Sequence, residues 1–349
     1  MVRHDYKASC LKRIEITDSS EIVESGHRPQ VGDVVAVKIT EKKGDYNELD
    51  LPGGELVEIE EGDIVLGTFG NRAGVKGYIG EVPDEVSEGD RIDFIGSGGV
   101  FGDCLSAAKN LGEPCEAEFL GYVSQDEKIL NMKDYGIERV EEIEGEPRLV
   151  GVVSTRMDAG KTTLATKIIE NLSEEYEVGS LKLTGSARER DRVSMFESGS
   201  EISLDFVDAG LPSTVDDPEI VISSAKGLIN HAWNEDLDFI VIEFGAGLIS
   251  NYHVQEVLRD LDVKNSIFSI CGVSLDVTGA YGLKKVLTDL DYELSFMSGP
   301  ITDTTVGKDT VEDYVGVPAL NAFSEEEMTE AKEILAQSFE EFTAPRPSF

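Results

Sequence analysis

The sequence predicts an α/β domain with a mostly parallel, doubly wound sheet, preceded by a small, mainly-β barrel or sandwich domain. From about residue 148 onward, short apolar strands alternate with amphipathic helical segments, which is typical of crossover units around a parallel sheet. Between residues 30 and 137, short strands instead follow one another across glycine turns. We expect residues 1–29 to form an N-terminal extension and residues 138–147 to form a linker between domains 30–137 and 148–349.

The individual elements follow from hydrophobic periodicity and from turn residues. In the first domain we expect a helix over residues 104–111 and strands at 34–40, 55–60, 63–69, 91–95 and 116–123. In the second domain, strands are expected at 149–154, 177–183, 239–243, 266–271 and 293–297. Helices are expected there at 161–174, 218–232, 252–261, 276–289 and 324–342.

The chain is strongly acidic. Its 69 Asp and Glu residues face 31 Lys and Arg residues, which gives a formal net charge of -38, and the acids are spread over the whole length. Such an even acidic coat is typical of halophilic proteins, whose carboxylates keep them hydrated while salt screens the repulsion. Without a basic stripe, we do not expect a nucleic-acid partner.

Cysteine, histidine and hydropathy patterns exclude several other classes of protein. The four cysteines are scattered and form no CxxC pair, and the four histidines have no zinc-binding spacing. No apolar run is long enough to cross a membrane, and no signal-peptide core follows the first residues. We therefore expect a cytoplasmic protein with reduced thiols and no membrane partner.

The segment Ser154–Thr163, Ser-Thr-Arg-Met-Asp-Ala-Gly-Lys-Thr-Thr, has the composition of a phosphate-binding loop. It lies between an expected buried strand and an expected helix, so its backbone amides converge where phosphate oxygens bind. Lys161 is expected to reach the β- and γ-phosphates, and the Thr162 hydroxyl is expected to bind Mg²⁺. The residues expected to contact nucleotide are Thr155, Asp158, Ala159, Gly160, Lys161, Thr162 and Thr163. The loop departs from the usual P-loop pattern because Thr155 replaces the first glycine.

An acid-tipped strand supplies the second expected part of the site. In Leu237–Gly247, four apolar residues precede Glu243, and small residues follow it. At the carboxyl end of a parallel strand, Glu243 is expected to lie beside the phosphate loop and either to bind Mg²⁺ or to position the attacking group. The alternative is that Glu243 only caps the following turn.

Three motifs in this order make the second domain resemble dethiobiotin synthetase and the MinD-like (SIMIBI) class of P-loop NTPases. They are Gly160–Thr162, Leu181-Lys-Leu-Thr-Gly185 and Glu243-Phe-Gly-Ala-Gly247. The resemblance implies that Lys182 faces the transferred phosphate or an acidic substrate. In MinD and ParA ATPases a signature lysine occupies the position of Arg156, which implies a second catalytic cation there. The Gly-Thr-Asp-Thr-Gly opening of dethiobiotin synthetase is absent, so the biotin-pathway substrate is not implied.

A second resemblance is to MobB, the molybdopterin-guanine dinucleotide protein. It rests on the short Gly-Lys-Thr-Thr loop, on Val178-Gly-Ser-Leu-Lys182 and on the acid-tipped strand. MobB-like proteins bind GTP and assist a partner enzyme. This resemblance therefore implies a nucleotide-switched binding or adaptor protein instead of a metabolic enzyme. Neither resemblance extends to the first domain.

Three further features bear on ligands. Residues 186–192 form the most cationic patch, which either receives an anionic ligand or makes internal ion pairs at the start of a helix. Asp208, at the end of an expected strand, is a candidate additional Mg²⁺ ligand. Residues 298–303 follow the last strand, where related proteins often recognise the nucleobase.

These observations predict an Mg²⁺-dependent ATP- or GTP-binding protein. The leading hypothesis is NTP hydrolysis, or ATP-dependent phosphoryl transfer or ligation on a small acidic substrate. Lys161, Glu243, Lys182 and Arg156 are its expected catalytic residues, and Thr162, Glu243 and Asp208 its expected metal ligands. The alternative is the nucleotide-switched adaptor. We also expect a homodimer.

Overall fold

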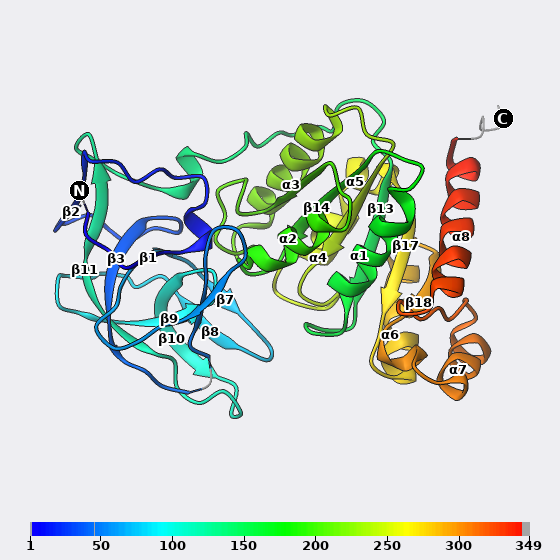
Figure 1. Ribbon diagram of the computed structural model, residues 1–349, viewed down its shortest axis with the longest axis horizontal. Coiled ribbons are helices and arrows are strands. Elements are labelled where there is room, and N and C mark those ends of the chain that lie inside the picture. Colours follow the sequence, from blue (N-terminus) through cyan, green and yellow to red (C-terminus); the bar gives the residue numbers. More distant parts are fainter. Residues whose placement is uncertain (1, 45, 344–349) are drawn as a thin grey trace. The chain divides into compact units, whose positions relative to one another are not determined.

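The computed structural model describes residues 2–44 and 46–343 (Figure 1). The chain forms two compact units. The first, which we call the barrel unit, contains the chain up to Arg139 together with Gly185–Val193 and Asp205–Ile220. The second, the parallel-sheet unit, contains Val140–Thr184, Ser194–Leu204 and the chain from Val221 onward. Residues 344–349 of the expected second domain lie outside the described residues.

Five strands of the barrel unit close into a ring. They are β3 (Val34–Glu41), β6 (Ile64–Phe69), β9 (Arg91–Gly96), β10 (Val100–Ala107) and β11 (Glu116–Gln125). Around the ring β6 pairs with β3, β3 with β11, β11 with β9 and β9 with β10, all antiparallel. A parallel pairing of β10 with β6 completes the closure. Of the two expected architectures, the structure is therefore the barrel.

Aromatic side chains fill the barrel unit. Phe69 stacks on Phe119 with ring centroids 5.8 Å apart, and the rings of Phe94 and Phe101 lie 5.5 Å apart. Burying such rings is a major source of stability in a small β-structure. The shorter elements around the ring are β1 (Tyr6–Lys7), β2 (Ser20–Val23), β4 (Glu48–Asp50), β5 (Leu56–Glu58), β7 (Arg72–Ala73), β8 (Tyr78–Glu81), β12 (Lys128–Ile129), and the 3-10 helices η1 (Ser9–Leu11) and η2 (Met132–Asp134).

The prediction of a helix over residues 104–111 is wrong. Residues up to Ala107 belong to strand β10, which pairs antiparallel with β8 and β9. The sequence Cys104-Leu-Ser-Ala-Ala-Lys has good helix propensity, but the long-range ladder to β8 outweighs that local preference. A register shift between Cys104 and Ser106 marks a bulge at the point where the helix was expected.

The parallel-sheet unit has six strands in the order β15-β14-β16-β13-β17-β18. They are β13 (Leu149–Ser154), β14 (Val178–Thr184), β15 (Ile202–Asp205), β16 (Phe239–Phe244), β17 (Ile267–Val273) and β18 (Leu294–Ser298). The pairs β14–β16, β16–β13, β13–β17 and β17–β18 are parallel. This confirms the expected α/β class and places the carboxyl ends of these strands at one edge.

Helices cover both faces of this sheet. Every residue of β13, β14 and β16 is buried, which a strand achieves only when both of its faces are covered. Side chains of α1 and α8 share one apolar cluster with sheet residues such as Val150 and Phe296. The helices are α1 (Lys161–Leu172), α2 (Glu189–Glu197), α3 (Pro218–Trp233), α4 (Val254–Arg259), α5 (Leu261–Ser266), α6 (Val277–Asp289), α7 (Thr305–Val315) and α8 (Glu325–Thr343), with the 3-10 helix η3 (Pro300–Thr302).

One expected helix of this unit is divided. Instead of a single helix over 252–261, α4 ends at Arg259 and α5 begins at Leu261. Asp260 separates the two helices because its backbone is extended. Its side chain caps α5 by accepting hydrogen bonds from the amides of Asp262 and Val263. Within the described ranges 2–44 and 46–343, the structure has no helix long and apolar enough to cross a membrane.

Candidate functional site

The loop at Ser154–Thr163, which we call the phosphate loop after its sequence, follows the central strand β13 of the parallel sheet. Strand β13 lies between β16 and β17, and its last residue, Ser154, leads into the loop. Helix α1 begins at Lys161, preceded by Gly160 in a left-handed conformation with φ 104°. Glycine adopts that conformation without strain, so the chain can turn sharply from the loop into the helix. The strand, loop and helix therefore have the arrangement that the sequence predicts.

Lys161 folds back over this loop. Its side chain belongs to the first residue of α1 and is buried, with 6% of the residue exposed. The ammonium donates to Ser154 Oγ at 3.0 Å, to the Arg156 carbonyl at 3.5 Å and to the Ala246 carbonyl. All of these acceptors are neutral oxygens. These contacts hold the ammonium over the loop.

Glu243 and Lys182 lie in register on adjoining strands. Glu243, on β16, pairs with Val152 on β13 and with Lys182 on β14. Both charged residues are buried, with Glu243 exposed by 3% and Lys182 by 5%. Because the three strands are parallel, the acid and the lysine reach the same edge of the sheet as the phosphate loop. The three motifs that were separate in sequence are thus neighbours in the fold.

Two glycines after Glu243 allow the close approach of these segments. A Cβ on Gly247 would lie 2.8 Å from the Arg156 Cα and 3.0 Å from the Thr155 carbonyl oxygen. A Cβ on Gly245 would lie 2.7 Å from the Thr184 carbonyl oxygen. Both clashes are with backbone atoms, which cannot move aside like a side chain. The chain after β16 therefore packs against the phosphate loop and the end of β14 only because these residues are glycine.

The remaining loop residues have different environments. The Thr155 amide donates to Val273 O at 3.2 Å, which ties the loop to β17. The half-buried Arg156 donates from Nε to Met157 O at 3.0 Å. Asp158 is exposed and adopts φ 55°, as a turn residue does. Ala159 is buried, whereas Thr162 and Thr163 are half-buried in the first turn of α1.

A cavity of about 220 Å³ adjoins this loop. Ser298, at the end of β18, is completely buried on its wall, and Ser298 Oγ has no hydrogen-bond partner among the described residues. Phe323 lies at the same cavity and is 77% exposed. An uncompensated buried hydroxyl is costly, so it marks a place where a ligand can bind. The cavity is lined by Asp158, Ala159, Gly160, Thr163, Ser298, Gly299, Pro300, Asp303, Asn321, Ala322 and Phe323.

Sequence reasoning found only part of this cavity. Residues 298–303 were singled out because they follow the last strand, but Asn321 and Phe323 were not considered. They lie on the connection between α7 and α8, and the Asn321 side chain donates to Asp303 Oδ1 at 3.0 Å. In sequence these residues form only the short segment Asn321-Ala-Phe-Ser324 before a helix, and such a segment is too common to indicate a site.

Asp208 and the cationic patch do not belong to the unit that holds the phosphate loop. Both are in the barrel unit, where Asp208 accepts from Lys12 Nζ at 2.8 Å. In the patch, Arg192 donates from Nε to Glu189 Oε1 at 2.9 Å. This is the internal ion pairing that was one of the two expectations for residues 186–192. Since the carboxylate of Asp208 is used in an ion pair, we do not include it among the candidate metal ligands.

Comparisons with known proteins give loose likenesses. No protein-family model matches the chain, and no curated protein sequence matches it. Among solved structures, the 54-kDa signal recognition particle protein from Aeropyrum pernix, in complex with GDP, is 15% identical with a TM-score of 0.38. That match covers 58% of this chain and 50% of the other, so the chain spans half the length of that protein.

Two more solved structures are similar to the same degree. Chloroplast FtsY from Physcomitrella patens is 19% identical over 61% of this chain and 70% of the other, with a TM-score of 0.38. A ParA-family ATPase from Chlorobium tepidum is 18% identical over 56% of this chain and 92% of the other, with a TM-score of 0.33. Because each likeness is loose, only the residues described above carry weight for function.

Proposed function

We propose that this protein binds ATP or GTP with Mg²⁺ and either hydrolyses it or transfers its phosphoryl group to a small acidic substrate. The observation that carries the proposal is the position of Lys161. This buried lysine begins the helix after a central parallel strand and turns its ammonium back over the preceding loop. A cation beside a helix N-terminus and converging amides is the arrangement that binds nucleotide phosphates.

The charged side chains near the loop would act on the phosphoryl group during its transfer. Lys161 and the loop amides would stabilise negative charge on that group. Lys182, in register with Glu243, would hold either the same group or the carboxylate of an acidic acceptor. Arg156, on the loop itself, would add a further positive charge. Glu243 would either hold Mg²⁺ or position the attacking oxygen.

The residues present fit a magnesium ion. Thr162 offers a hydroxyl and Glu243 a carboxylate, and both are oxygen ligands of the kind that Mg²⁺ prefers. Across residues 2–44 and 46–343 there is no group of three or more His, Cys, Asp or Glu that could hold a metal ion. A bound Mg²⁺ would take the Thr162 and Glu243 oxygens and complete its shell with phosphate and water. When bound, Mg²⁺ would neutralise charge on the β- and γ-phosphates.

The cavity beside the loop is the proposed position of the nucleobase. It begins at Asp158–Gly160 and Thr163 of the phosphate loop and extends to the end of β18. Ser298 Oγ would there acquire the hydrogen-bond partner that the described residues do not give it. The exposed ring of Phe323 offers a face on which a base can stack.

The alternative function is a nucleotide-switched adaptor. One observation favours it: the chain that leaves β14 and the chain that leaves β15 both join the barrel unit instead of the parallel-sheet unit. A conformational change at the carboxyl ends of these strands would then alter segments that belong to the barrel unit. In this case the nucleotide would control a contact of the barrel unit, and turnover would be slow or absent.

Phosphate release distinguishes the two functions. Purified protein is mixed with Mg²⁺ and ATP or GTP at high salt, with and without a panel of small carboxylic acids, and nucleotide affinity is measured in parallel. The enzyme hypothesis predicts phosphate release that Glu243→Gln reduces by about a hundredfold. Binding without release under every condition would favour the adaptor.

A further inference from the structure

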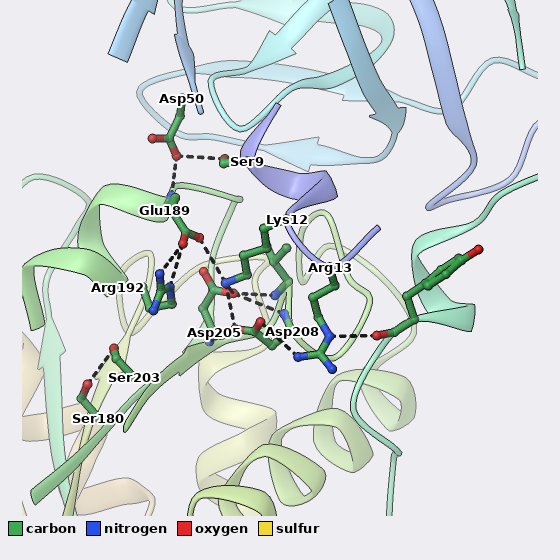
Figure 2. A network of polar contacts seen from close by, with 12 residues as sticks. Ser9, Lys12, Arg13, Asp50, Ser180, Glu189, Arg192, Ser203, Asp205 and Asp208 are labelled. Atoms are coloured by element: carbon green, nitrogen blue, oxygen red, sulfur yellow. Dashed lines mark hydrogen bonds and ion pairs between the residues drawn. The ribbon is translucent and has the colours of Figure 1, made fainter. Parts of the chain in front are cut away.

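The barrel unit contains a buried network of charged side chains outside the proposed nucleotide site. Figure 2 shows the Lys12 ammonium surrounded by three acids, 2.8 Å from Asp208, 3.0 Å from Asp205 and 3.1 Å from Glu189. The three carboxylates are almost completely buried. A buried charge is costly unless it is paired, and removing one partner of such a group is strongly destabilising. The contacts around Lys12 therefore form a fixed junction.

The charges of this junction are balanced. Arg13 adds a second cation 3.6 Å from Asp208, and Arg192 adds a third by its hydrogen bonds to Glu189. Burial alone would lower the pKa of Lys12, but Asp205, Asp208 and Glu189 outweigh burial and raise the pKa above its ordinary value. Lys12 is therefore charged at any physiological pH.

A second contact fixes the start of helix α2. The Glu189 amide, at the first residue of α2, donates to Asp50 Oδ2. The Ser9 hydroxyl donates to the same oxygen at 3.0 Å. Asp50 lies in strand β4, so a residue distant in sequence provides the N-terminal cap of this helix (Figure 2). The N-terminal part of the chain thus holds Gly185–Val193 by ion pairs and by a cap.

The held segment begins immediately after the last residue of β14. Gly185 donates its amide to Thr214 Oγ1 at 2.9 Å, and its carbonyl accepts from the Thr214 amide at 2.9 Å. This pair joins the two segments that the Lys12 junction also joins, Gly185–Val193 and Asp205–Ile220. The end of β14 is therefore joined by one peptide bond to a segment that these hydrogen bonds and ion pairs hold.

Thr184, the residue before Gly185, contacts the chain after β16. Thr184 Oγ1 donates to the Gly245 carbonyl, and the carbonyl of the next residue, Ala246, accepts from Lys161. A phosphate group at the loop would compete with Ala246 for the ammonium of Lys161. Thr184 is thus one peptide unit away from an acceptor that a bound triphosphate would displace.

We propose that Thr184 couples the phosphate loop to the barrel unit, so that a bound nucleoside triphosphate changes how tightly Gly185–Val193 is held. The inference rests on the proposed nucleotide binding and adds that this binding affects the barrel unit. The path runs from Lys161 through Ala246 and Gly245 to Thr184, and from there along the covalent chain. The barrel unit is then the part of the protein that responds to the nucleotide.

Hydrogen–deuterium exchange of the full chain tests this coupling. Exchange of peptides that cover residues 185–193 and 205–220 is measured with Mg²⁺ alone and with Mg²⁺ plus the β,γ-imido analogues of ATP and GTP. Wild type is compared with Thr184→Val, which removes the hydroxyl, and with Thr184→Ser, which keeps it. Thr288→Val is the matched control, since Thr288 is exposed on α6 and its hydroxyl donates to the Lys284 carbonyl of its own helix.

In wild type, Thr184→Ser and Thr288→Val, the analogue changes exchange over 185–193 by at least about threefold. Thr184→Val still binds the analogue, but its exchange over 185–193 no longer responds. An equal response in Thr184→Val and wild type would overturn the coupling, and so would binding to wild type with no change over 185–193. If neither analogue binds wild type, the proposed function itself fails, and the direct binding measurement identifies that case.

Discussion

At the scale of single residues, the site is shaped as much by glycines as by charges. Lys182 and Glu243 are buried near the ends of adjoining strands, and Lys161 is buried at the start of α1, so closely packed backbone surrounds all three charges. Because Gly247 has no side chain, the chain after β16 can lie against the backbone of Thr155 and Arg156. The loop's conformation therefore depends on a residue far from it in sequence.

Gly247→Ala should lower nucleotide affinity by at least about tenfold, since the new methyl group can be accommodated only by displacing the phosphate loop. The measurement is titration with a fluorescent ATP or GTP analogue, accompanied by thermal unfolding to show that the variant is folded. Gly282→Ala is the control, because a Cβ there meets no atom within 4 Å. Equal affinity in the two variants would show that the Gly247 contact does not shape the loop.

At the scale of elements, Asp50 makes the attachment of α2 sensitive to pH. Burial raises the pKa of Asp50 to about 6 from the ordinary 3.8, and the hydrogen bonds from Glu189 and Ser9 only partly offset that effect. Glu189 nearby raises the pKa further, and Arg188 lowers it. A carboxyl with a raised pKa in the folded state stabilises the fold below pH 3.8, and this contribution is lost as pH rises through about 6.

Asp50→Asn should remove this pH dependence. Asparagine still caps a helix but does not titrate, so the variant gains stability relative to wild type as pH rises from about 4 to about 7, by up to about 3 kcal/mol. The measurement is denaturant unfolding of both proteins across that range. Asp84→Asn, at a side chain that is 96% exposed, should follow wild type throughout. A constant difference between Asp50→Asn and wild type would contradict the account.

Sequence patterns predicted most elements but not all of their connections. The strands around the phosphate loop were placed to within one or two residues, because fully buried parallel strands form unmistakable apolar runs such as Leu149–Ser154. Strand β10 was mistaken for a helix because its pairing with β8 is long-range and leaves no local signal. Likewise, Lys12 and Asp208 are nearly two hundred residues apart, so no spacing rule could have joined them.

In the candidate site too, residues in local motifs could be predicted, whereas residues brought together by folding could not. Lys161, Glu243 and Lys182 could be proposed from sequence because each belongs to a short motif at the end of a strand. Ser298 and Phe323 come together only through folding, and neither belongs to a motif. Asp208 was proposed as a metal ligand because it follows a strand, but its neighbour β15 leads into the barrel unit, where cations already surround it.

At the scale of the whole molecule, the net charge of -38 makes stability depend on salt. Like charges spread over the chain repel one another in the compact state, and added ions screen that repulsion within a few ångströms at molar concentration. The midpoint of thermal unfolding should therefore rise by several degrees between about 0.1 M and about 2 M KCl. Sucrose of equal osmolality screens no charge and is the control. A midpoint independent of KCl would contradict the expectation.

The central claim is that the loop before α1 binds nucleotide phosphates through Lys161. The most direct test is the affinity of Lys161→Ala for a fluorescent ATP or GTP analogue with Mg²⁺ at high salt. Lys167→Ala is the matched control, since Lys167 lies on the same helix and pairs with Glu170 at the surface. We expect Lys167→Ala to bind like wild type and Lys161→Ala to bind at least about thirtyfold more weakly. Equal affinity in the two variants would contradict the account.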